Sequence, residues 1–181
     1  RTQVEPPTRD EPVEREFEPY RPDESGITYH PKLASTQHHR QLRRRSGQLV
    51  TPERVIGADD RQVFYPNGYP WRCIGKIYAW TDPSSGPAWV GSGALVGENV
   101  VVTASHVVPW GADPWMMRFE PAHWDGSSLY GSGAVSYVQK YRGYRNHQQG
   151  DDMAVLKLYS SLGDNLGYFG YKTYHDSWEG G

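Results

Sequence analysis

The chain has 181 residues, enough for one domain and a tail, and its 19 Lys and Arg residues against 21 Asp and Glu residues give a net charge of −2. This near-neutral balance gives no electrostatic reason to expect a nucleic acid or an anionic membrane as a partner. Twenty Gly, fourteen Pro and thirteen Tyr residues favour an all-β chain with many turns, and no apolar run approaches the roughly 18 residues of a membrane-spanning helix.

Residues 1–54 differ in composition from the rest of the chain. Their prolines alternate with acidic residues, a composition that buries too little apolar surface to offset the entropy lost on ordering. An arginine-rich cluster at 40–45 is typical either of a solvated charge run or of a processing site. His38 and His39 beside it have no Cys or carboxylate at ligand spacing, so we expect no metal site there. We predict an extended Pro-rich leader, a tail or a prosegment, ordered only where a folded domain or another chain holds it.

After residue 55 the sequence predicts short strands separated by Gly and Pro turns. The predicted strands span 72–80, 88–96, 100–103, 115–119, 134–141 and 153–159. Short strands of this kind form an antiparallel sandwich or a barrel. The sequence has no long helical pattern, and we allow only a single helical turn after His106, which Pro109 would end.

The chain has one cysteine, Cys73, so no disulfide can form within it. Since free Cys behaves as a small apolar residue, we expect a buried thiol on the first predicted strand, the alternative being a bond to another chain. Cys73 precedes His106 by a whole predicted hairpin, which argues against a Cys nucleophile.

A histidine and an aspartate carry the strongest chemical signal. The sequence Thr-Ala-Ser-His at 103–106 ends in His106, and Asp152 follows 46 residues later. In a His-Asp-Ser hydrolase the imidazole takes a proton from the serine, while a carboxylate fixes the imidazole tautomer. Both residues lie at ends of predicted strands, where a sheet can hold functional groups firmly. Adjacent carboxylates point to opposite faces of a strand, so only one of Asp151 and Asp152 can face the imidazole.

These residues resemble a known family. From about residue 55 to 181 the chain resembles the first half of a chymotrypsin-fold serine protease, which has Thr-Ala-Ala-His where this chain has Thr-Ala-Ser-His. Val-Ile-Gly at 55–57, Tyr-Pro-Trp-Arg at 69–72 and the stretch 162–171 are similar to the mature start, first strand and post-aspartate strand of secreted glutamyl endopeptidases.

The resemblance implies an all-β fold: a six-stranded antiparallel barrel of the chymotrypsin type, first barrel only, over 55–181, preceded by the leader at 1–54. It implies that His106 and Asp152 are catalytic, with Asp152 facing the imidazole because it stands in the register of the family's Asp-x-x-x-x-x-Leu strand. It further implies secretion, cleavage after Glu or Asp, and a new N-terminus at Val55 after removal of the leader. We expect no cofactor and no metal.

The serine nucleophile is the missing part. Ser160, Ser161 and Ser177 follow Asp152, but Trp178 after Ser177 does not fit the glycine-rich loop that forms an oxyanion hole. The two Gly-Ser-Gly sequences, at 91–93 and 131–133, precede Asp152 and are predicted to be strand-edge turns. We therefore expect the serine and the oxyanion hole to lie on a second barrel that is absent from this chain.

Three interpretations follow. The chain is part of a serine endopeptidase that a second chain completes, its other partner being a protein or peptide substrate. Alternatively, it is an inactive protease homologue that serves as a binding or structural module, or it is a nicked or truncated zymogen fragment. We expect the remaining histidines, His123 and His147, to lie in loops. The tryptophans, which include Trp71, Trp80, Trp89 and Trp115, are expected in the core and at the barrel rim rather than on sugars or bases.

Overall fold

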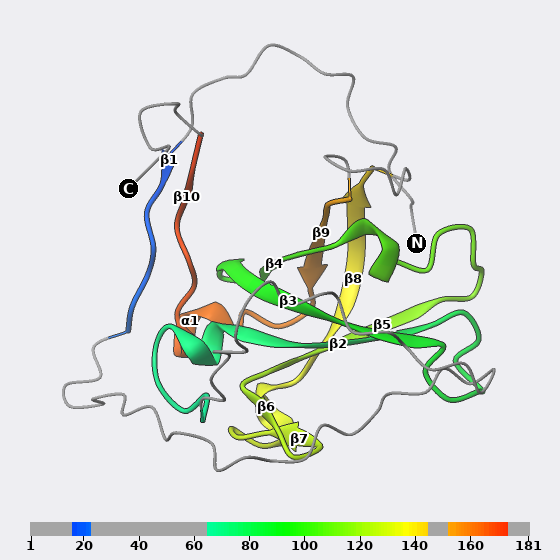
Figure 1. Cartoon of the computed structure of the whole chain (residues 1–181), viewed down its shortest axis with the longest axis horizontal. Helices are drawn as coiled ribbons and strands as arrows, with labels where there is room; N and C mark the ends of the chain where they lie inside the picture. The colour runs from blue at the N-terminus through cyan, green and yellow to red at the C-terminus, as the bar shows by residue number, and fades with distance from the viewer. Residues whose placement is uncertain (1–15, 23–64, 145–151, 174–181) are drawn as a thin grey trace, which may run out of the picture. The chain divides into compact units, whose positions relative to one another are not determined.

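The computed structural model describes residues 16–22, 65–144 and 152–173 (Figure 1). All of these except Tyr65 belong to one compact unit of the chain, which comprises residues 1–29 and 66–181. Among the described residues the regular structure is almost entirely β, interrupted by three 3-10 turns and one short α-helix. None of the helices in the described part of the chain has the length and apolar character that crossing a membrane would require.

Six strands close into an antiparallel barrel, as the sequence predicted. Their order around the barrel is β2-β3-β4-β9-β8-β5, and β5 pairs with β2 to close it. The strands are β2 (Ile74–Trp80), β3 (Trp89–Gly97), β4 (Val100–Thr103), β5 (Met116–Pro121), β8 (Ser136–Gly143) and β9 (Ala154–Leu158). The predicted all-β fold of the chymotrypsin type is confirmed for the described residues.

The barrel closes around side chains that alternate along each strand. In β9, Ala154, Leu156 and Leu158 are buried, whereas Val155 and Lys157 are exposed. The fully buried side chains include Ile77, Leu95, Val101, Met117, Phe119 and Leu156. These residues form one contiguous hydrophobic core, so the barrel is a packed scaffold for whatever its strand ends carry.

The prediction for one of the two Gly-Ser-Gly sequences was wrong. The Gly-Ser-Gly sequence at 91–93 is not a strand-edge turn but lies within β3. A Cβ atom at Gly93 would stand 2.7 Å from Ile77 Cδ1 and 2.7 Å from Val101 Cγ1, so the core packs directly against this backbone. Glycine inside a strand often marks such a close approach. In the other Gly-Ser-Gly sequence Gly131 precedes a 3-10 turn, η3 (Ser132–Ala134), and the other two residues lie within it, so β8 begins later than predicted.

The first predicted strand also begins later, because residues Trp71–Cys73 form a 3-10 turn, η1. Cys73 is a free and fully buried thiol, as expected, but it lies in this turn and not on the strand. Its Sγ donates to the carbonyl oxygen of Leu166 at 3.4 Å, and the neighbouring Arg72 Nε donates to the same oxygen at 2.7 Å. Burial raises the pKa of the Cys73 thiol to about 12, opposed in part by the charge of Arg72.

The stretch 162–171, which resembles a family strand, is mostly not a strand here. It contains the one-turn helix α1 (Gly163–Leu166), and only its last residue enters a two-residue strand, β10 (Tyr171–Lys172). Gly163 makes this possible, because a Cβ there would lie 2.6 Å from the carbonyl oxygen of Gly97 at the end of β3. The short helix can therefore pack tightly onto the β3–β4 connection.

A two-stranded hairpin, β6 (His123–Trp124) and β7 (Ser127–Ser128), follows β5. His123 therefore lies in a short strand and not in a loop, and its Nδ1 is 3.0 Å from Glu120 Oε2. His147 lies outside the described residues. Of the tryptophans, Trp80 and Trp115 are buried in the core and Trp89 is partly exposed, which agrees with the prediction of core and rim positions.

The described part of the leader is extended. Residues Glu16–Phe17 form β1, which pairs antiparallel with β10; in Figure 1 the blue and red strands lie side by side. Tyr20 continues this pairing through a bridge to Tyr168. The leader is thus held against the domain over the residues that the structure describes. The predicted domain boundary between residues 54 and 55 lies outside the described residues and stays a prediction.

Candidate active site

His106 and Asp152 are hydrogen-bonded to each other. His106 Nδ1 lies 2.6 Å from Asp152 Oδ2, and the backbone N–H of His106 donates to Asp152 Oδ1 at 2.8 Å. The carboxylate thus engages the ring with one oxygen and the main chain with the other, which fixes both the position and the rotation of the imidazole. The predicted contact between Asp152 and the imidazole is confirmed. Asp151 lies outside the described residues.

This geometry also assigns the tautomer. A carboxylate oxygen can only accept, so the proton on the neutral ring must be on Nδ1, and Nε2 carries the lone pair. The His106 side chain is 62% exposed and that of Asp152 is 31% exposed, so the imidazole projects outward while its partner is more enclosed. The pair therefore presents a basic nitrogen on an accessible ring.

His106 lies in a 3-10 turn, η2 (Ser105–Val107), which follows β4. The predicted helical turn is therefore present, but it surrounds His106 instead of following it. Two indole groups hold the turn. Trp89 Nε1 donates to the carbonyl oxygen of Val107 at 2.7 Å, and Trp110 Nε1 donates to the carbonyl oxygen of Ser105 at 2.9 Å. Because these bonds come from two separate segments, the carbonyls on both sides of His106 are fixed.

Ser105 adds a third attachment. Its side chain is fully buried, and its hydroxyl donates to the carbonyl oxygen of Tyr144 while accepting from Trp110 Nε1 at 3.0 Å. Tyr144 follows β8 directly, and its N–H donates to the carbonyl oxygen of Met153, the residue after Asp152, at 3.3 Å. The Ser105 hydroxyl therefore connects the turn that carries His106 to the pair of strands that delivers Asp152.

Glycines bring the same segments close together. A Cβ at Gly91 in β3 would lie 2.4 Å from Val107 Cγ2, so β3 can approach the His106 turn only because residue 91 has no side chain. A Cβ at Gly143, at the end of β8, would lie 2.6 Å from the carbonyl oxygen of Met153. The segments that carry His106 and Asp152 thus each rest on a close approach to a glycine, to the Val107 side chain at Gly91 and to the Met153 backbone at Gly143, that a larger residue would prevent.

The serines named in the sequence do not complete a triad here. Ser92 lies in β3, where its carbonyl accepts from Thr103 Oγ1 at 2.7 Å, and Ser160 and Ser161 are exposed after β9. Ser177 lies outside the described residues. Within residues 16–22, 65–144 and 152–173, no serine hydroxyl hydrogen-bonds to His106. In the same ranges, no group of three or more His, Cys, Asp or Glu side chains could hold a metal ion.

Sequence reasoning identified His106 and Asp152 but missed the residues that support them, Ser105, Trp89, Trp110 and Gly91. Only one of these carries a signal in the sequence. Ser105 replaces an alanine of the family motif, and a polar side chain directly before the histidine needs a buried partner. The contacts of Trp89, Trp110 and Gly91 depend on how distant strands meet, which a local pattern does not encode.

Comparison with known proteins places this site in a family. The family model described as Trypsin matches residues 66–180. The chain is similar to an extracellular metalloprotease of Bacillus subtilis (strain 168), with 28% identity over 134 residues, 72% of this chain and 42% of that protein. It is also similar to a glutamyl endopeptidase of Bacillus licheniformis, with 29% identity over 121 residues, 65% of this chain and 36% of that protein.

A solved structure of a Glu endopeptidase in complex with MPD is 19% identical and covers 56% of this chain and 46% of its own, with a TM-score of 0.46. The chain spans less than half the length of the curated relatives it matches. The Trypsin model covers well over half of the chain, including His106 and Asp152 and the barrel that positions them. The chain therefore belongs to the trypsin family.

Proposed function

We propose that this chain provides the general base and its orienting carboxylate to a serine endopeptidase. His106 is the base and Asp152 orients it. The observation that carries the proposal is the 2.6 Å contact between His106 Nδ1 and Asp152 Oδ2, because it directs the basic Nε2 away from the carboxylate on a largely exposed ring. In the proposed reaction Nε2 takes the proton of a serine hydroxyl as the serine attacks the peptide carbonyl. It then gives that proton to the leaving amine.

The nucleophilic serine and the oxyanion hole are proposed to come from a second barrel outside this sequence. Asp152 would stabilise the imidazolium formed during proton transfer, and its second oxygen, bonded to the His106 N–H, would keep the ring from rotating. The lengths of the relatives support this proposal. Each relative is more than twice as long as its part that aligns with this chain.

A serine-reactive fluorophosphonate probe tests this proposal on the complete protein. We expect one labelled serine, located by peptide mapping outside residues 1–181, and loss of both labelling and peptidase activity in His106→Ala. Label on Ser177 or on another serine of this chain would refute the proposed division. An unlabelled, correctly folded complete protein would instead favour the binding or structural module.

For the substrate we propose cleavage after Glu or Asp, outside the cell. The support is the similarity to a relative named glutamyl endopeptidase and to another named extracellular. Profiling the complete protein with a peptide library is the direct measurement. A preference for Arg, Lys or large aromatic residues before the cleaved bond would reject this specificity while leaving the catalytic role of His106 in place.

The leader at 1–54 is proposed to be a prosegment whose removal frees the α-amino group of Val55. A fixed ammonium near the substrate pocket could pair with a Glu side chain, whereas in the uncut chain the same nitrogen is a neutral amide. Cleavage after Arg54, or first after Arg45, is then expected to raise the activity of the complete protein. Equal activity before and after cleavage would make the leader a partner-binding tail.

A further inference from the structure

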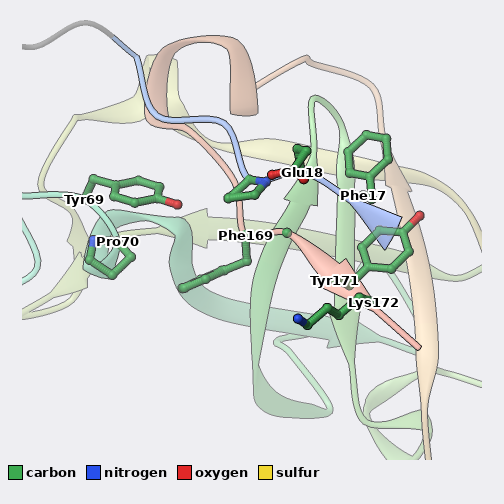
Figure 2. A pocket seen from close by; sticks show the side chains of 9 residues that line it. Phe17, Glu18, Tyr69, Pro70, Phe169, Tyr171 and Lys172 are labelled. Carbon is green, nitrogen blue, oxygen red and sulfur yellow. The ribbon is translucent and has the colours of Figure 1, made fainter. Parts of the chain in front are cut away.

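The described leader residues dock against a surface of the domain formed by Tyr69 and residues 167–172. A groove of about 430 Å³ lies between the two, and it is lined by Tyr69, Pro70 and residues 169–172 of the domain and by leader residues 17–19. Figure 2 shows the aromatic side chains that line it from both segments. Residues 16–22 lie outside the part of the chain that matches the Trypsin family model.

The domain side of the groove is fixed to the barrel. The N–H of Phe169 donates to the carbonyl oxygen of Leu95 in β3 at 2.9 Å, and Tyr69 Oη donates to the carbonyl oxygen of Tyr168 at 3.4 Å. Residues 168 and 169 are therefore attached to the rest of the domain by bonds that do not involve the leader. A surface held in this way loses little conformational freedom when a strand binds to it.

The leader side is held by main-chain pairing and by aromatic faces. The N–H of Tyr20 donates to the carbonyl oxygen of Tyr168 at 3.1 Å, and the N–H of Tyr168 donates back at 2.9 Å. The rings of Phe17 and Tyr171 stack with centroids 5.4 Å apart, and the guanidinium of Arg21 lies 5.7 Å from the centre of the Tyr69 ring. The leader strand and β10 thus form a two-stranded sheet of their own, separate from the barrel, in which main-chain pairing is combined with contacts between side chains.

Two glycines adapt the surface to this strand. A Cβ at Gly170 would lie 2.6 Å from the carbonyl oxygen of Phe17 and 2.7 Å from Pro19 Cδ, and the nearest atoms all belong to the leader. At Gly167 a Cβ would lie 2.6 Å from the carbonyl oxygen of Tyr20. The leader thus lies directly on the backbone of these two glycines. A side chain added at residue 170 would meet the leader first, because the atoms nearest to its Cβ are leader atoms and not core atoms.

The docked strand keeps much of its apolar surface in water. Phe17 and Tyr20 are each 42% exposed and Tyr171 is 53% exposed, so this contact buries far less apolar area than a barrel strand does. A short strand of this kind gains little beyond the entropy it loses on ordering, unless a covalent link supplies a high local concentration.

We propose that residues 16–22 and the surface formed by Tyr69 and residues 167–172 are a separable docking pair, in which the strand binds because it is attached and leaves when the chain between residues 22 and 65 is cut. A separate peptide of this strand is expected to bind weakly, because the contact buries little apolar area, whereas the covalent link raises the effective concentration of the strand beside its docking surface. Cutting the link therefore frees this surface at micromolar protein. The inference rests on the proposed prosegment role only for the place of the cut.

Hydrogen exchange of the full chain tests the docking, with Gly170→Ala as the displacing variant. We expect the Tyr20 and Tyr168 amides to be protected in the unsubstituted chain and to lose that protection in Gly170→Ala, while amides of Val101 and Leu156 in the barrel stay protected. Gly133→Ala is the matched control, because a Cβ at Gly133 meets no atom within 4 Å. Protection of Tyr20 that persists in Gly170→Ala would overturn the docking geometry.

Cutting the chain tests the separability. A recognition sequence for a site-specific protease is placed between residues 23 and 64, the chain is cut, and gel filtration is run at micromolar concentration. We expect the leader fragment to elute apart from the domain and Tyr168 to lose its protection. Co-elution with retained protection would show a permanently bound subunit and overturn the proposal. Neither readout needs peptidase activity, so failure here leaves the proposed roles of His106 and Asp152 unaffected.

Discussion

The turn that carries His106 and the leader strand at 16–22 are both held by backbone hydrogen bonds and aromatic side chains, yet the two differ in how they are fixed. The turn receives bonds from Trp89, Trp110 and Asp152, which come from three separate parts of the chain. The leader strand is paired with one segment, and its aromatic rings remain partly in water.

This difference shows how one small domain can combine a rigid site with a detachable segment. Closure of the barrel brings β3, β4, β8 and β9 around the His106 turn, so moving the turn would break contacts on several strands at once. The leader strand can separate by breaking a single pairing. Positioning for chemistry needs the first arrangement, and reversible attachment needs the second. Four substitutions or measurements test the contrast.

The largest effect is expected from Asp152→Asn. An asparagine amide would donate to Nδ1 or leave it unpaired, which favours the tautomer with its proton on Nε2 and removes the base. We expect kcat of the complete protein to fall by about 10⁴-fold. Asp164→Asn, which removes an exposed carboxylate from α1, is the control and should leave kcat unchanged. A loss below about 10-fold would show that Asp152 does not set the tautomer.

The second largest effect is expected from Gly91→Ala. The new methyl group would lie 2.4 Å from Val107 Cγ2, and both residues belong to packed segments, so we expect a loss of about 1–3 kcal/mol in the free energy of unfolding. Urea denaturation measures this loss. Gly86→Ala is the matched control, because a Cβ there meets no atom within 4 Å. Unchanged stability in Gly91→Ala would mean that the His106 turn moves freely, which contradicts the contrast with the leader.

Ser105→Ala removes the link between the two arms of the site. The carbonyl oxygen of Tyr144 would lose its buried donor, which costs about 1–3 kcal/mol in the free energy of unfolding. The second measurement is the Nδ1 proton resonance of His106, which should broaden because the turn that carries the imidazole is held less firmly against Asp152. Ser85→Ala removes an exposed hydroxyl that bonds only to local carbonyls, and it should change stability by less than about 0.5 kcal/mol. Equal effects of Ser105→Ala and Ser85→Ala would show that Ser105 does not position the His106 turn.

The effect that is smallest at neutral pH concerns the thiol of Cys73. Its pKa is raised to about 12 by burial, so the folded protein keeps the thiol proton at pH values where the unfolded chain, with a pKa of 9.0, loses it. The contribution of Cys73 to stability is therefore complete below pH 9 and is lost as the pH rises toward about 12. The pH dependence of unfolding should be flatter in Cys73→Ala over this range. A native protein that reacts readily with a thiol reagent at pH 8 would contradict the buried environment.

The sequence was sufficient to predict the strands, and its resemblance to a known family selected the barrel and pointed to His106 and Asp152. The six predicted strands correspond to β2, β3, β4, β5, β8 and β9. The strand pattern alone left a sandwich and a barrel open, and it was the family-like sequence around His106 and Asp152 that singled out these two candidate site residues. Local information of this kind is contained in short stretches of the chain.

The tertiary structure alone decided what supports and surrounds these features. The role of Ser105 depends on Tyr144, which is 39 residues away, and the role of Gly91 depends on Val107 across two strands. The same holds for the leader, whose composition predicts only an extended segment, whereas its pairing with β10 requires the aromatic surface and the glycine at 170. Alternation and propensity act over a few residues, but contacts between distant strands exist only after the barrel has closed, and closure determines which backbone atoms meet.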